Sequence, residues 1–135
     1  MIKHSIRKAY ADCSGGQVHY RYMRGEGTPL VLLHQTASSS AMFDLVMQRL
    51  AGQRPMYAFD TPGFGGSFDP ESPPDMPQYG HWIAEAIDDV EIGEFHLLGH
   101  HTGVCIGAEI AVARPQRVRS FAMIGPVPLS VRERG

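Results

Sequence analysis

The sequence has few cysteines, a single tryptophan and no long apolar segment. Cys13 and Cys105 lie about ninety positions apart, so they cannot form the dense disulfide framework of a small secreted domain. They are expected to be free thiols in a reducing compartment. No window approaches the ~20 apolar residues that span a bilayer, and no apolar h-region follows the basic N-terminal residues. These absences predict a cytoplasmic protein without a membrane partner.

An excess of charge of one sign is also missing. The chain has 12 basic and 14 acidic residues, a net charge of -2 and no run of lysine or arginine, which argues against a nucleic-acid partner. With 135 residues, 43% of them hydrophobic and 19% charged, the composition is that of a globular protein. Disorder, collagen and coiled coil are excluded, and one domain over residues 1–135 is expected.

The apolar pattern predicts an α/β fold. Segments 3–12 and 17–24 flank two glycines and favour an antiparallel hairpin. Four near-continuous apolar runs follow, typical of strands buried on both faces of a parallel sheet. These runs are 29–33, 55–59, 95–98 and 118–124. The prediction is a mostly parallel sheet with an antiparallel N-terminal hairpin and flanking helices.

Helical periodicity appears between the apolar runs. The expected helices are 41–50, 78–90 and 103–113. The first presents an apolar stripe of Phe43, Val46, Met47 and Leu50. Ser40 is its expected N-cap, whereas the second helix is entered through Asp75 and left at Gly93. Gly103 and Gly107 would let the third helix lie close to a strand.

Ligands of open α/β sheets bind beyond the carboxyl ends of the parallel strands. The residues at these positions are His34–Gln35, Asp60–Thr61, Gly99–Gly103 and Gly125–Pro126. Gly99 and Gly103 bracket His101, as a sharp strand-to-helix turn requires. Asp60 is expected to order its own turn.

Three motifs in this order, LLHQ, DTPGFGGS and LLGHHTG, resemble those of the α/β-hydrolase superfamily over residues 15–125. The resemblance implies a partial α/β-hydrolase fold. His101 stands where the family has Ser, Asp or Cys as the nucleophile. The acid and the histidine that complete the family's triad are missing up to Gly135, and residues 126–135 would begin a lid.

The resemblance also implies a site and an activity. The backbone N–H groups of Gln35 and Thr102 would form an oxyanion hole, beside His34 and with His101 as the catalytic residue. The expected reaction is hydrolysis or carbon–carbon cleavage of a small ester or other carbonyl compound, with no cofactor. The alternative is a non-catalytic protein of the same fold that binds a small ligand or a partner in the former active-site pocket.

Several residues have two interpretations. His101 is either a functional residue or one that only occupies space in a site that is no longer catalytic. His34 either shapes its loop or takes part in catalysis. No ligand spacing supports a metal site from His34, His100, His101 and Asp60, so none is expected. The run 118–124 would lie at a sheet edge, which predicts association into homo-oligomers.

Overall fold

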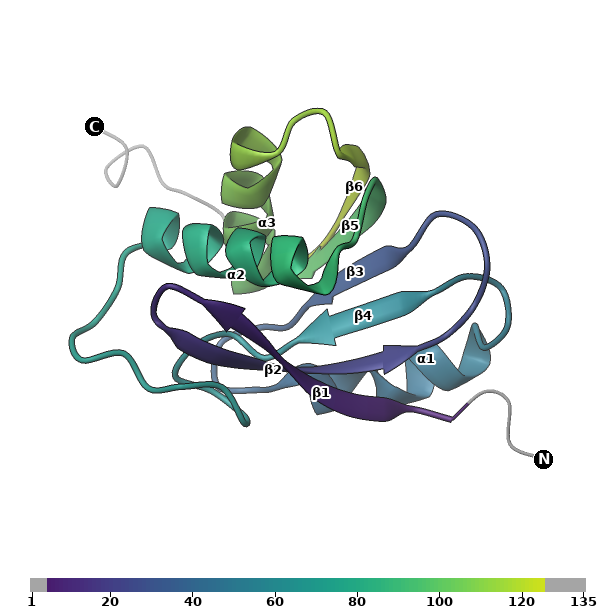
Figure 1. Cartoon of the computed structure of the whole chain (residues 1–135), viewed down its shortest axis with the longest axis horizontal. Coiled ribbons are helices and arrows are strands. Elements are labelled where there is room, and N and C mark those ends of the chain that lie inside the picture. The colour runs from purple at the N-terminus through teal and green to yellow at the C-terminus, as the bar shows by residue number, and fades with distance from the viewer. Residues whose placement is uncertain (1–4, 126–135) are drawn as a thin grey trace.

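The computed structural model describes residues 5–125, which form one six-stranded sheet with helices on both faces (Figure 1). The elements in chain order are β1 (Arg7–Cys13), β2 (Gly16–Met23), β3 (Leu30–Leu33), the 3-10 helix η1 (Ser40–Phe43), α1 (Asp44–Arg49), β4 (Met56–Phe59), α2 (Met76–Val90), β5 (Phe95–His100), α3 (Thr102–Ala113) and β6 (Val118–Ile124). The expected start of a lid at 126–135 lies outside the described residues.

The sheet confirms the predicted α/β architecture. Its strand order is β1-β2-β4-β3-β5-β6. β1 and β2 form the antiparallel hairpin, and β2 also pairs antiparallel with β4. β3 is parallel to both β4 and β5, and β5 is parallel to β6. The carboxyl ends of the four parallel strands β3, β4, β5 and β6 therefore point the same way, and the site is expected beyond these strand ends.

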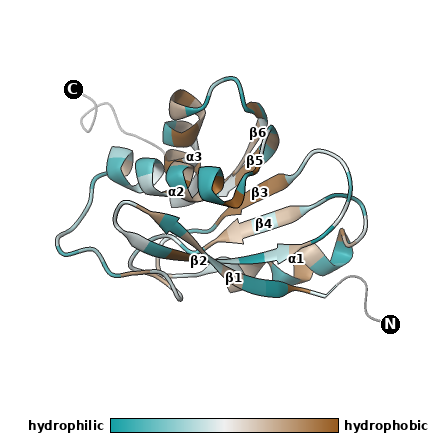
Figure 2. Ribbon diagram, in the orientation of Figure 1, coloured by the Kyte–Doolittle hydropathy of each residue, from teal (hydrophilic) through white to brown (hydrophobic). Residues whose placement is uncertain are grey.

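The sheet separates two apolar cores. On one face α2 and α3 pack through Ile83, Ile87, Ile106 and Ile110 (Figure 1). On the other, Phe43 of η1 and Met47 of α1 complete a smaller core. Figure 2 shows the central strand β3 as hydrophobic, which fits its burial on both faces. Among residues 5–125, no helix combines the length and apolarity needed to cross a bilayer.

The helix expected at 41–50 differs from the prediction in its first turn and in its stripe. It begins as η1, and its N-cap is Ser39, whose hydroxyl accepts a hydrogen bond from the Ala41 N–H at 3.2 Å. Ser40 is not the cap because it is the first residue of η1, and its own N–H donates to the Asp60 carboxylate at 2.6 Å. Val46 was expected in the apolar stripe but is 41% exposed, since only one edge of this short helix faces the sheet.

For the helix predicted at 78–90, the expected N-terminal cap is confirmed and the expected C-terminal cap is wrong. Asp75 caps α2, with its carboxylate accepting the Gln78 N–H at 2.9 Å. The helix closes at Glu91, which adopts a left-handed conformation with φ of 65°. Gly93 is therefore not the C-terminal cap. Its carbonyl instead accepts a hydrogen bond from Arg117 at 3.1 Å.

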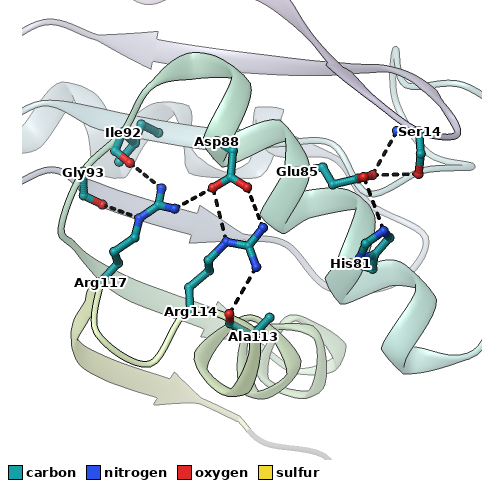
Figure 3. Close-up of polar contacts among 9 residues, drawn as sticks. All are labelled: Ser14, His81, Glu85, Asp88, Ile92, Gly93, Ala113, Arg114 and Arg117. Carbon is teal, nitrogen blue, oxygen red and sulfur yellow. Dashed lines mark hydrogen bonds and ion pairs between the residues drawn. The ribbon is translucent and has the colours of Figure 1, made fainter.

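An ion-pair network ties the end of α2 to the segment that leads into β6 (Figure 3). Asp88 accepts hydrogen bonds from both Arg114 and Arg117, each at 2.5 Å. On the same helix, Glu85 accepts the N–H and the hydroxyl of Ser14 at 2.9 and 2.7 Å. These contacts attach α2 to the hairpin on one side and to the segment between α3 and β6 on the other.

The apolar run at 118–124 was predicted to be buried on both faces, and this is wrong. β6 occupies the sheet edge, and Met123 and Ile124 remain 56% and 47% exposed. Within residues 5–125 no strand pairs with its outer side. The edge position is as expected, and it leaves apolar side chains beside unpaired backbone groups.

We expect this edge to drive association of the chain at high concentration, because unpaired apolar edge strands pair with other chains. Size-exclusion chromatography with light scattering should show mass rising with concentration. Ile124→Lys should reduce that rise, since charge on an edge strand opposes pairing. A monomer at all concentrations, with or without the substitution, would contradict this prediction.

Candidate active site

The residues Gly99–Gly103 form a sharp turn between β5 and α3, which we call the elbow. His101 lies at its apex with φ of 54° and ψ of -115°, a strained backbone for a side chain. A Cβ atom at Gly99 would lie 2.5 Å from the Gly103 carbonyl oxygen, and one at Gly103 would lie 2.4 Å from the Leu33 carbonyl oxygen. Both glycines are therefore required for close backbone approach, as predicted.

The His101 imidazole is exposed and is directed toward the end of β6. A Cβ atom at Gly125, which has φ of 56°, would lie 3.0 Å from His101 Nε2. The His101 N–H donates to the Ile124 carbonyl at 2.9 Å. The His100 ring stands edge-on to the His101 ring, with centroids 4.5 Å apart. The backbone hydrogen bond and the closeness of the ring to Gly125 thus place His101 beside the end of β6.

His34 follows β3 and is 1% exposed. Its Nε2 accepts the Thr61 N–H at 2.9 Å, so the proton of the neutral ring lies on Nδ1, which donates to the Gln35 carbonyl at 2.6 Å. Burial lowers the pKa of His34 below its usual value of 6.5, against the opposing effects of Gln35 and Asp60. Both ring nitrogens are engaged, which supports the interpretation that His34 shapes the loop.

A cavity of about 130 Å³, which we call the elbow cavity, lies beside Thr102. Its polar lining includes His34, Thr36, Thr61 and Thr102, and its aromatic lining is Phe64 and Tyr79. His101 does not line it, and its imidazole lies beside Gly125. The structure therefore brings His34 and Thr102 together around one space, with His101 adjacent to it.

The loop after β3 contains a residue that the sequence analysis missed. Thr36 donates both its N–H and its hydroxyl to Thr102 Oγ1, at 2.6 and 2.7 Å. Gln35, the expected oxyanion donor, does not line the elbow cavity, and its carbonyl accepts from His34. The role of the Gln35 N–H stays a prediction. Thr36 directly follows Gln35, the predicted oxyanion donor. This position was the only sign in the sequence that Thr36 could belong to the site.

Asp60 orders its turn, as expected. It is 2% exposed, and its carboxylate accepts N–H groups from Ser40 at 2.6 Å and Gly66 at 2.9 Å, and contacts His19 Nδ1 at 2.8 Å. Burial alone would raise the pKa of the Asp60 carboxyl. The hydrogen bonds to the carboxylate lower the pKa by more than burial raises it, so it lies below the usual 3.8. Within residues 5–125, no three His, Cys, Asp or Glu side chains lie close enough to hold a metal ion.

Known proteins share this arrangement of strand, elbow and helix. A family model described as the alpha/beta hydrolase fold matches residues 28–133. The chain belongs to this family. The earlier resemblance drawn from the three motifs is thereby confirmed.

Among curated proteins, the chain is 32% identical over 103 residues to the 1-acylglycerol-3-phosphate O-acyltransferase ABHD5 of Rattus norvegicus, covering 73% of the chain and 29% of that protein. It is 33% identical over 105 residues to the pimeloyl-(acyl-carrier protein) methyl ester esterase of Aeromonas salmonicida (strain A449), covering 77% of the chain and 40% of that protein. The chain thus spans less than half the length of these relatives.

Solved structures support the same fold. N-acyl homoserine lactonase AidH in complex with N-butanoyl homoserine superposes with a TM-score of 0.86 at 28% identity, over 96% of this chain and 48% of that one. The haloalkane dehalogenase DatA from Agrobacterium tumefaciens C58 superposes with a TM-score of 0.83 at 25% identity, over 90% of this chain and 42% of that one.

Proposed function

We propose that this chain carries the elbow half of a hydrolase site that acts on a small ester or other carbonyl compound, with His101 at the nucleophile position. The observation that carries the proposal is the elbow itself. A histidine is held at φ of 54° between two glycines that cannot bear side chains. Such strain persists where the surrounding structure enforces it, and it is concentrated at functional sites.

The surroundings of the elbow suit an acyl group. The N-terminus of α3 favours the negative charge that develops on a carbonyl oxygen during attack. Thr36 carries two further donors beside it, and both are bonded to Thr102 Oγ1 in this structure. The elbow cavity of about 130 Å³, bounded by Phe64 and Tyr79, would accept only a small, partly apolar acyl group. Two similar proteins are named as an esterase and a lactonase, and both names describe cleavage of an ester-type bond.

The chemistry available to His101 is nucleophilic attack by a neutral ring nitrogen on the acyl carbon. The bond to the leaving alkoxide breaks and leaves an acyl-imidazolium, whose remaining ring N–H proton passes to the alkoxide directly or through water. The products of this step are an alcohol and a neutral acyl-imidazole. Water then hydrolyses this labile adduct, releasing the carboxylic acid and regenerating the imidazole. An ordinary triad would instead use histidine as the base for a hydroxyl or thiol nucleophile.

The test is hydrolysis of p-nitrophenyl acetate by the unchanged chain, by His101→Ala and by His101→Ser. The unchanged chain should exceed His101→Ala, because only the former has the attacking nitrogen. His101→Ser should lack ordinary triad efficiency, because a serine hydroxyl needs a base to take its proton. In enzymes whose triad residues have been removed, oxyanion stabilisation and binding alone still accelerate hydrolysis about 10³ to 10⁴-fold over the reaction in water.

Active-site titration with a fluorophosphonate separates the outcomes of this test. Stoichiometric labelling and fast turnover of His101→Ser would reveal a general base within residues 1–135. That result would contradict the proposal that the chain carries only the elbow half of a hydrolase site. Equal rates for the unchanged chain and His101→Ala would remove His101 from the chemistry. That result would favour the alternative, a ligand-binding protein of the same fold.

A further inference from the structure

The elbow cavity has an unusual pair of facing threonines. Thr36 lies in the loop after β3, and Thr102 is the first residue of α3, immediately after His101. The Thr36 N–H donates to Thr102 Oγ1 at 2.6 Å, and the Thr36 hydroxyl donates to the same oxygen at 2.7 Å. Both residues line the elbow cavity. Two donors from one residue therefore converge on a single side-chain oxygen beside the apex of the elbow.

A hydroxyl oxygen has two lone pairs, and here both accept a hydrogen bond from Thr36. The two donors of Thr36 are thus fully used by a group within the protein. Any ligand oxygen that bonds to Thr36 must first displace the Thr102 hydroxyl. Rotation of the half-buried Thr102 side chain about χ1 would make that displacement, and Thr36 is exposed to an entering ligand.

We propose that the Thr102 hydroxyl is a resident ligand of the Thr36 donor pair, and that the carbonyl or carboxylate oxygen of a substrate replaces it on binding. The identity of the entering oxygen rests on the proposed function. Two consequences follow for specificity. An oxygen with stronger acceptor character than a hydroxyl displaces Thr102, whereas an alcohol gains nothing by the exchange. Thr102 therefore selects acyl compounds over alcohols and weakens the binding of all ligands by competing with them.

Acetate provides a simple probe, with the backbone amide signal of Thr36 as the readout in ¹H–¹⁵N spectra of the whole chain. Thr102→Val keeps the shape of the side chain and removes the competing oxygen. It should bind acetate more tightly, on the order of fivefold, since a single net hydrogen bond is worth about 0.5–1.5 kcal/mol. Thr102→Ser keeps the hydroxyl and should bind as the unchanged chain does. Thr36→Val loses one donor and should bind more weakly.

Equal acetate affinity in Thr102→Val and Thr102→Ser would overturn the proposal. So would acetate shifts confined to the Gln35 and Thr102 amides with none at Thr36, because they would place the donor one residue earlier. Thr102→Ala gives the same comparison if the valine variant does not fold. The readout is binding, so it is independent of turnover. Tighter acetate binding without any ester hydrolysis would support the resident ligand and contradict the proposed function.

Discussion

Substituting alanine for Gly103 is expected to destabilise the chain by at least about 3 kcal/mol, the upper end of the range for overpacking in a rigid interior. The new Cβ atom would lie 2.4 Å from the Leu33 carbonyl oxygen and 3.0 Å from that of His34. Both are backbone atoms at the end of β3, which is hydrogen-bonded on both sides by β4 and β5. The strand cannot yield without breaking its pairing, so α3 must move away from the sheet.

Urea denaturation followed by circular dichroism measures this loss. Gly93→Ala is the matched control, because a Cβ atom there would meet nothing within 4 Å. Its stability should stay within about 0.5 kcal/mol of the unchanged chain, as for other surface changes. Gly107→Ala should lie between the two, since the nearest atoms belong to the Phe121 side chain, which can rotate. Equal stability of the Gly103 and Gly93 variants would contradict the close approach of α3 to β3.

The elbow was predictable from the sequence because its signal is local. Two glycines around one residue, placed between an apolar run and a helical segment, specify a tight turn whatever lies elsewhere in the chain. The same holds for Asp75, which caps the helix that it directly precedes. Signals carried within a few residues were sufficient in both cases.

Features that depend on distant residues could not be predicted in this way. Thr36 was missed because its importance comes from Thr102, which lies on another element. Ser40 was assigned as an N-cap because nothing local shows that the helix already begins at this residue, whose N–H donates to the distant Asp60 carboxylate. The β6 run has the composition of a buried strand, yet burial requires neighbours on both sides of it. Contacts made across the fold decided each of these outcomes.

Asp60→Asn is expected to destabilise the chain by about 2–4 kcal/mol at neutral pH, because an amide cannot accept every hydrogen bond that the carboxylate accepts. One carboxylate oxygen accepts the Ser40 N–H, and the other accepts the Gly66 N–H and contacts His19. Whichever way the asparagine amide is oriented, its NH₂ group faces a backbone donor at a buried position. Asp69→Asn, at an exposed carboxylate, is the matched control and should stay within about 0.5 kcal/mol.

The pH dependence of this difference identifies its cause. The pKa of Asp60 lies below 3.8 in the folded chain, so the unfolded chain binds its proton first on acidification. The stabilisation by Asp60 is thus complete above pH 3.8 and is lost as the pH falls through the lower, folded pKa. His34 adds a separate loss below pH 6.5 in both proteins, and this loss is slightly larger in Asp60→Asn because the Asp60 charge that raises the His34 pKa is gone. Urea denaturation should therefore show a gap between the unchanged chain and Asp60→Asn that is constant near neutrality and narrows in acid. A gap that did not change with pH would mean that Asp60 stabilises its turn by packing and not by its charge.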